Sequence, residues 1–205
     1  MPKALSLAWR ALALGAMVAA GPAVLAGPAG EVPRVRPSVE ADPRTGLREW
    51  QWAGGRLSVG LGQLLPDQVR AFFQGRGFPA PMADRIARRC VFWGRLAHNG
   101  AKGSVTLDLT RWRTHGRDGE AALLLPRHWQ RQRGWDSVPR AARTAFRWAL
   151  FPTRQRFEPG DWLLGMIILD LPPGADFDLE LRWREGDEQR RRLLTDLSCP
   201  ADTRS

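Results

Sequence analysis

Arginine and tryptophan alternate over a short stretch of the chain, in a pattern suited to binding negatively charged groups. The stretch contains Arg127, Trp129, Arg131, Arg133 and Trp135. A guanidinium group donates two parallel hydrogen bonds to a phosphate, carboxylate or sulfate group, and an indole ring packs on a flat or apolar neighbour. These five residues are therefore the candidate site for an anionic partner. The alternative is an ordinary surface, with the arginines solvated and the tryptophans turned inward.

The candidate site belongs to a segment in which positive charge is concentrated. Residues 121–157 contain eight arginines and one acid, for a net charge of +7, whereas residues 158–188 contain nine acids and two arginines, for a net charge of −7. Either the two segments lie side by side and neutralise each other, or they leave one strongly basic region exposed. The sequence leaves both arrangements open.

Three histidines offer a second chemistry, metal binding. His98, His115 and His128 fall in or beside predicted turns, and Met82 and Met166 could add thioether sulfur. Imidazole and thioether are acceptable ligands for copper. A periplasmic copper-handling accessory protein for an envelope oxidase is therefore the alternative function. Isolated polar loop residues are the simpler interpretation of the same histidines.

The sequence contains none of the familiar catalytic motifs. The GxSxG, SxxK, HExxH, phosphate-loop and dinucleotide-binding patterns are all missing from it. Carboxylates occur together at Asp176, Asp178 and Glu180. Asp178 and Glu180 lie with Arg182 on one face of a predicted strand, which indicates a solvated outer face rather than an acid–base pair across a cleft. We therefore expect a non-catalytic protein without a cofactor. A hydrolase with an unfamiliar site is the least favoured alternative.

The only two cysteines, Cys90 and Cys199, are predicted to form a disulfide. One lies at the start of a predicted strand and the other follows the last strand, and an oxidising compartment would let them join. The rival interpretation is a pair of metal-binding thiolates. It is weaker, because a single pair without a CxxC or CxxxC neighbour does not resemble a metal site.

The first 26 residues have the order of a secretory signal peptide. Lys3 and Arg10 precede or flank an apolar run over residues 11–20, and residues 24–26 supply a small-residue end. The run is too short for a membrane-spanning helix, which needs about twenty apolar residues. We therefore expect an exported protein, periplasmic or extracellular, that is not an integral membrane protein.

The rest of the chain divides into an arm, one domain and a tail. Residues 27–46 hold four prolines among charges and show no apolar periodicity, so they are predicted to be a flexible arm. Residues 47–199 are predicted to form a single β-rich domain, because their length suits one core. Residues 200–205 are the tail.

Alternating apolar and polar residues predict most of the secondary structure of that domain. Hairpins are expected over residues 47–61 and 91–110, and further strands over 143–151, 162–171, 177–183 and up to 197. Helical spacing predicts helices over 66–76 and after Pro81, and a short one at 126–132.

About eight strands with a short two-helix insertion predict a mainly β fold. The expected architecture is an antiparallel two-sheet sandwich that resembles immunoglobulin-like sandwiches in general, and a small β-barrel is the alternative. The predicted fold, the signal peptide, the missing catalytic motifs and the charge pattern together predict an exported, non-catalytic binding or assembly module of the cell envelope. Its partner would be an acidic protein, a lipid headgroup or an envelope polyanion, and the expected location excludes nucleic acid.

Overall fold

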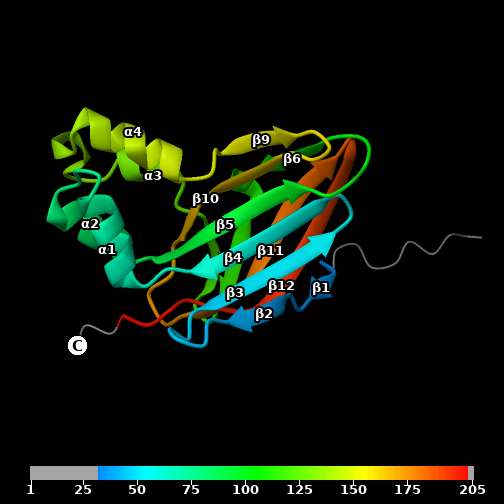
Figure 1. The fold of residues 1–205 in the computed structure, drawn as a ribbon, viewed down its shortest axis with the longest axis horizontal. Helices are drawn as coiled ribbons and strands as arrows, with labels where there is room; N and C mark the ends of the chain where they lie inside the picture. Colours follow the sequence, from blue (N-terminus) through cyan, green and yellow to red (C-terminus); the bar gives the residue numbers. More distant parts are fainter. Residues whose placement is uncertain (1–31, 203–205) are drawn as a thin grey trace, which may run out of the picture. The chain divides into compact units, whose positions relative to one another are not determined.

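Alternation of apolar and polar residues builds two β-sheets within residues 32–202, the part of the chain that the computed structural model describes (Figure 1). The first sheet has the strand order β10-β5-β4-β3-β2. Its strands are β2 (Ser38–Ala41), β3 (Arg48–Gly54), β4 (Leu57–Gln63), β5 (Cys90–His98) and β10 (Trp162–Leu169). All neighbours in this sheet run antiparallel.

The second sheet is built around a long C-terminal hairpin. Its order is β1-β12-β11-β6-β9, with β7 also paired to β11 and β8 paired to β7. Only β1 and β12 run parallel. The strands are β1 (Arg34–Val35), β6 (Val105–Asp108), β7 (Arg113–Gly116), β8 (Gly119–Ala122), β9 (Arg154–Phe157), β11 (Asp176–Glu185) and β12 (Glu188–Ser198).

Aromatic side chains fill the space between the two sheets. Trp52 of β3 contacts Trp183 of β11 edge to face, with ring centroids 5.5 Å apart. Phe92 of β5 contacts Phe177 of β11 in the same way, at 5.9 Å. Burial of such large apolar surfaces is the main favourable contribution to folding. The mainly β, two-sheet sandwich is therefore confirmed, and the β-barrel alternative was wrong because the strands form two separate sheets.

The predicted disulfide is present and connects the two sheets. Cys90 begins β5 of the first sheet, and Cys199 follows β12 of the second. Their Cα atoms lie 5.5 Å apart, and both side chains are buried in the core between the sheets. The bond thus fixes the end of the last strand to the middle of the chain.

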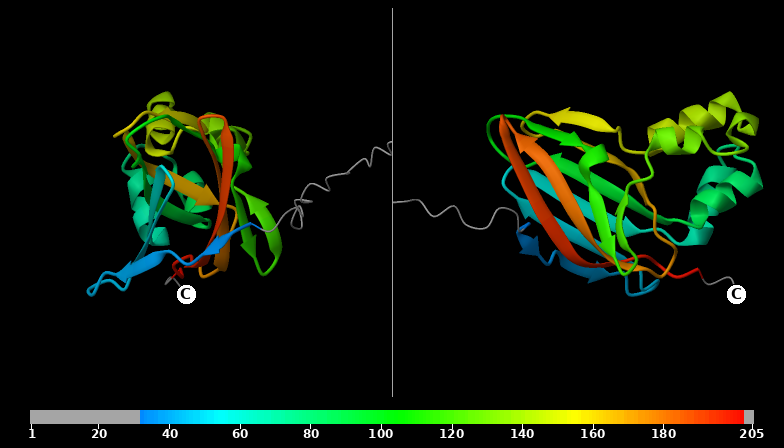
Figure 2. Two further views of the ribbon diagram at one scale, coloured as in Figure 1. Left: turned by 90° about the vertical axis from the view of Figure 1, so that its right-hand side faces the viewer. Right: turned by 180° about the vertical axis from the view of Figure 1, so that it is seen from behind.

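Four helices pack together at one end of the sandwich (Figures 1 and 2). We call residues 66–89 and 126–149 the helical lobe. It has a core of its own, in which Phe73, Phe78 and Phe146 make ring contacts with one another. The predicted two-helix insertion is present, and two further helices join it. The four are α1 (Pro66–Gln74), α2 (Ala80–Ala87), α3 (Pro126–Gln130) and α4 (Arg140–Ala149).

The strand predicted over residues 143–151 is wrong, because this segment belongs mostly to α4. Its alternation of Phe146 and Trp148 resembles a strand, but only Phe146 is buried, whereas Trp148 is 83% exposed. Ala142 and Phe146, four residues apart, are the pair that faces the lobe core. Alanine and arginine are also good helix formers.

The hairpin predicted over residues 91–110 is wrong in its pairing, although both of its strands exist. β5 pairs with β4 and β10 in the first sheet, whereas β6 pairs with β9 and β11 in the second. The turn between them therefore crosses from one sheet to the other. Alternation shows which face of a strand is buried, but it does not identify the neighbouring strand.

Two short strands lie within the predicted flexible arm. Residues 34–35 pair with β12, and residues 38–41 pair with β3. The side chains of β2 are all exposed, so this strand is held by backbone hydrogen bonds rather than by burial, and it leaves no apolar pattern. Residues 27–31, the predicted signal peptide and residues 203–205 lie outside the described residues.

The first residues of the predicted tail pack against the domain. Pro200 is buried, and its carbonyl accepts a hydrogen bond from the Gly174 backbone. Asp202 forms an ion pair with Arg70 of α1. Within residues 32–202, no helix has the length and apolar character needed to cross a membrane.

Candidate anion-binding site

The five residues of the predicted Arg/Trp site separate into a buried and an exposed set. Trp129 of α3 and Trp135 are core residues of the helical lobe, and the Trp129 Nε1 atom donates to the Leu124 carbonyl at 3.1 Å. The tryptophans are thus turned inward, as the alternative interpretation expected. Arg127, Arg131 and Arg133 are exposed to solvent. The exposed part of the predicted site is therefore mainly cationic.

A second set of arginines continues this basic surface along α4. Arg140, Arg143 and Arg147 recur at spacings of three and four residues, so they lie on one side of the helix. The opposite side carries the buried residues Ala142 and Phe146. We call the surface formed by the six exposed or half-exposed arginines of α3, α4 and the loop between them the arginine face. It consists of Arg127, Arg131, Arg133, Arg140, Arg143 and Arg147.

The α4 arginines surround a hollow in the surface of about 470 Å³. The Arg147 guanidinium also donates to the Thr144 hydroxyl at 3.3 Å. Next to Arg147, Trp148 projects into solvent with 83% of its surface exposed. The hollow is lined by Gln130, Trp135, Arg140, Arg143, Thr144 and Arg147. Three guanidinium groups, an amide and a hydroxyl can together bind a phosphate, sulfate or carboxylate group.

The net positive charge of the described residues lies in the helical lobe. The lobe contains eleven arginines and three aspartates, for a net charge of +8. The remaining described residues hold seventeen cationic and seventeen acidic side chains, so the sandwich has no net charge. Among the described residues, the acidic segment 158–188 forms an ion pair with the basic segment 121–157 at one place, between Glu158 and Arg156. Of the arginines in the basic segment, only Arg154 and Arg156 form ion pairs among the described residues.

One arginine of the lobe has a structural role instead. Arg70 of α1 is buried, and it forms ion pairs with Asp67, Asp84 and Asp202 at 2.6 to 2.8 Å. The hydrogen bonds to Asp202 and Asp84 raise the pKa of Arg70 above its usual value, against the effect of burial. Two of the lobe's three aspartates are thus used inside it, where they hold α1, α2 and the tail together.

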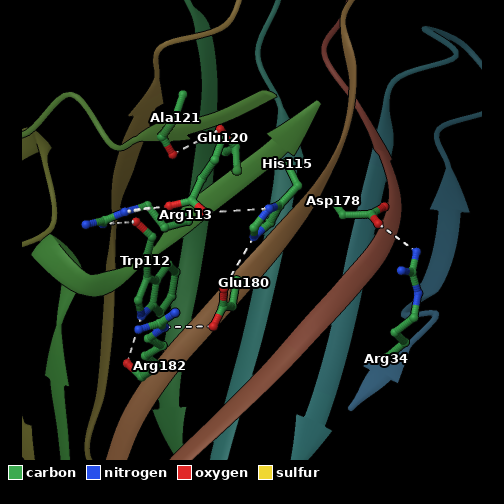
Figure 3. Close-up of polar contacts among 10 residues, drawn as sticks. Arg34, Trp112, Arg113, His115, Glu120, Ala121, Asp178, Glu180 and Arg182 are labelled. Atoms are coloured by element: carbon green, nitrogen blue, oxygen red, sulfur yellow. Dashed lines mark hydrogen bonds and ion pairs between the residues drawn. The ribbon is translucent and has the colours of Figure 1, made fainter. Parts of the chain in front are cut away.

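A cluster of polar residues on the outer face of the second sheet is shown in Figure 3. Glu180 of β11 is only 3% exposed, and its carboxylate lies 2.7 Å from Arg182 Nε and 3.3 Å from His115 Nε2. Burial alone would raise the pKa of Glu180, but the hydrogen bonds from Arg182 and His115 outweigh it and lower the pKa. The prediction that Glu180 lies on a solvated face was therefore wrong.

The neighbours of Glu180 explain this burial. Strand β7 pairs with β11 and places His115 beside Glu180, and Glu120 of β8 then forms an ion pair with Arg113. Asp178 on the same face forms an ion pair with Arg34 at 3.0 Å. The groups of this cluster thus bind one another and connect the strands that carry them. The cluster was not predictable from the sequence because the β7–β8 hairpin has almost no apolar alternation.

The predicted metal ligands lie at separate places. His98 at the end of β5 and His128 in α3 are at opposite ends of the sandwich (Figure 1). The Gly100 backbone donates to His98 Nδ1 at 3.0 Å, and His98 Nε2 donates to the Gly103 carbonyl at 2.9 Å. Residues 32–202 contain no group of three or more His, Cys, Asp or Glu side chains arranged to hold a metal ion.

The other predicted metal ligands make contacts with different parts of the protein. His115 belongs to the Glu180 cluster, and His128 contacts the Gln132 amide at 2.9 Å. Met82 is buried in the lobe core, and Met166 on β10 packs against that core from outside. The geometry therefore gives the copper-handling alternative no support. In contrast, arginines of the arginine face lie together around one hollow in the surface.

Comparison of the chain with protein-family models, with curated proteins and with solved structures finds no match. What the arginine face can do follows from its own residues. Guanidinium groups stay protonated at any physiological pH, so they bind anions but do not exchange protons with a substrate. The arrangement is suited to binding rather than to acid–base chemistry.

Proposed function

We propose that the chain is an exported, non-catalytic binding or assembly module of the cell envelope, and that its arginine face engages an anionic partner. The observation that carries this proposal is the confinement of net charge, +8 in the helical lobe and zero in the described part of the sandwich. A neutral scaffold with one strongly basic end directs anions to that end.

The arrangement of α4 supports the same proposal. Arg140, Arg143 and Arg147 hold their guanidinium groups around one hollow and have no ion-pair partner among residues 32–202. Unpaired cations spaced along one helix face repel one another, so their proximity is unfavourable until an anion binds between them. Trp148 next to them offers a large apolar surface with one hydrogen-bond donor, which suits the boundary of a lipid or protein surface.

The location is supported by the disulfide between Cys90 and Cys199. Disulfides persist in oxidising compartments and are rare in the cytosol of most organisms. In the envelope, phosphate and carboxylate groups are carried by lipid headgroups, by acidic polymers and by acidic proteins. All three classes present the chemistry that guanidinium groups recognise.

The test is binding of the purified protein to a panel of probes at two salt concentrations. The probes are vesicles of phosphatidylglycerol, vesicles of phosphatidylcholine, heparin and polyglutamate. We expect binding to at least one anionic probe and none to phosphatidylcholine. Affinity should fall steeply as ionic strength rises from about 0.01 M to about 0.15 M, because the screening length shortens from roughly 30 Å to roughly 8 Å.

A matched pair of triple variants locates the site. Replacement of Arg140, Arg143 and Arg147 by Gln should weaken binding to phosphatidylglycerol vesicles about 100-fold, at about 1 kcal/mol for each arginine near an anionic surface. The control replaces three exposed sandwich arginines by Gln, so the net charge changes equally. These are Arg44, Arg117 and Arg191. Equal loss of affinity in both variants, or binding that ignores salt, contradicts the proposal.

A further inference from the structure

The outer face of the first sheet carries a groove of about 460 Å³ that has no part in the proposed function. This volume falls within the range of roughly 300 to 1,000 Å³ found for small-molecule sites. The groove crosses β3, β4 and β5 on the face that is turned toward the viewer in Figure 1. Its lining residues are Ser38, Glu49, Gln51, Trp52, Ala53, Ser58, Val59, Gly60, Trp93, Arg95 and Asn99.

The floor of the groove is open because β4 has glycines where its neighbours have large side chains. In the strand register, Gly60 lies between Gln51 of β3 and Arg95 of β5, and Gly62 lies between Glu49 and Trp93. A Cβ atom added at Gly60 would find its nearest neighbours 3.8 and 3.9 Å away, at ordinary contact distance. A methyl group at position 60 would therefore fit without displacing its neighbours, and Gly60 forms part of the groove lining.

Trp93 forms the aromatic side of this groove. Its indole ring occupies the space where a side chain at Gly62 would stand, so the ring lies across the neighbouring strand. Trp93 is half-buried, which leaves part of the ring accessible from the groove. A second indole lies nearby on β10, where Trp162 is 58% exposed and the Arg95 guanidinium is 5.7 Å from its ring centroid.

Apart from the indole of Trp93, the groove is lined by several polar side chains whose charges sum to zero. Glu49 accepts a hydrogen bond from the Gln51 amide at 3.0 Å, and Asn99 accepts one from the Ser58 hydroxyl at 3.2 Å. Arg95 balances the charge of Glu49, and both line the same space. Carboxylate, amide, hydroxyl and guanidinium groups thus offer donors and acceptors around the groove, in addition to the indole.

We propose that this groove binds a neutral carbohydrate chain. A sugar ring has a flat C–H face that packs on an indole and a rim of hydroxyl groups that pair with short polar side chains, and Trp93 with Glu49 and Gln51 supplies both. A lipid tail would require an apolar lining, and a polyanion would require a positive one. Neither describes a groove in which one carboxylate stands opposite one guanidinium.

The test is titration of the full folded domain with four neutral oligosaccharides, the tetramers of cellulose, starch, xylan and chitin. Binding is followed by the indole N–H resonances and by calorimetry. We expect at least one tetramer to bind and to shift the Trp93 indole resonance. Trp93→Ala should weaken this binding at least about tenfold, as is typical of a central aromatic anchor.

A second variant keeps the experiment decisive if Trp93→Ala is poorly folded. Gly60→Leu places a side chain into the groove from a position with room for it and with no positive φ. It should abolish binding without lowering the melting temperature. Trp148→Ala, on the helical lobe, is the control and should bind sugar like the wild type.

Three outcomes would overturn the carbohydrate proposal. The first is that none of the four tetramers binds at millimolar concentration, and the second is that Gly60→Leu binds as well as the wild type. The third is that an acidic peptide, but no sugar, shifts the Trp93 resonance. Because Trp93→Ala and Gly60→Leu leave the arginine face and Trp148 unchanged, failure here is distinguishable from failure of the proposed function.

Discussion

Removal of the Cys90–Cys199 disulfide is expected to cost a large part of the stability of the domain. The bond joins residues 109 positions apart, and both cysteines lie in the core between the two sheets. The change is the double replacement Cys90→Ala and Cys199→Ala. Alanine is preferred to serine because it leaves no unpaired hydroxyl in an apolar site.

The expected magnitude follows from the length of the closed loop. Closing a loop of about 110 residues lowers the entropy of the unfolded chain by an amount worth about 5 kcal/mol at 25 °C, and measured losses run from about 2 to 5 kcal/mol. A folded domain of this size is stable by only about 5 to 15 kcal/mol. The melting temperature should fall by about 2 to 4 °C for each kcal/mol lost.

The assay is urea unfolding of the wild type, the double variant and the wild type reduced with a thiol. The double variant and the reduced wild type should lose similar free energies of unfolding, because both free the same loop. A loss below about 1 kcal/mol in the double variant would refute the loop-entropy reasoning. Two free thiols in the folded native protein would refute the disulfide itself.

Three further predictions concern other buried groups. Arg70→Ala should lower the free energy of unfolding by about 1 to 3 kcal/mol, because the ion pairs of a buried arginine are lost while the three carboxylates left behind are partly exposed to water. Exposed Arg131→Ala should change it by less than about 0.5 kcal/mol in the same urea titration. Glu180 has a lowered pKa in the folded protein, so its contribution is present above the usual glutamate pKa of about 4.3 and is lost as pH falls through the folded pKa. The stability difference between wild type and Glu180→Gln should accordingly shrink below about pH 4, and a difference that grows on acidification would contradict this sign. Gly62→Ala should destabilise the domain by about 1 to 3 kcal/mol because the Trp93 ring fills the space above Gly62. Gly60→Ala is the control and should not destabilise it. Equal melting temperatures for the two variants would count against the described position of Trp93.

The faces of the strands were predictable from the sequence because burial leaves a regular pattern. Trp50 and Trp52 on β3, and Leu179 and Leu181 on β11, alternate with polar residues, and all four are buried as that alternation predicts. The disulfide was predictable because the chain has only two cysteines. The pairing of β5 with β10 was not predictable, because it depends on which sheet a strand joins.

The candidate site was predicted only in part, because its main helix resembles a strand. Arg127, Arg131 and Arg133 were found from their charge. The site did not include Arg140, Arg143 and Arg147, because alternation of large residues from Thr144 onward concealed the helical period of α4. Treating Ala142 and Phe146 as a buried pair four residues apart would have revealed it. The sheet groove could not be predicted, because it depends on where β4 glycines fall beside Trp93.

The concentration of net positive charge at one end of the described domain gives the molecule a permanent electric dipole. In the field of a negatively charged surface, such a molecule rotates before it touches, so that the helices arrive first and the sandwich points away. Orientation of this kind acts on the rate of encounter more than on the lifetime of the complex. The sandwich, and the groove on its sheet, would then remain open to a second molecule while the helices are occupied.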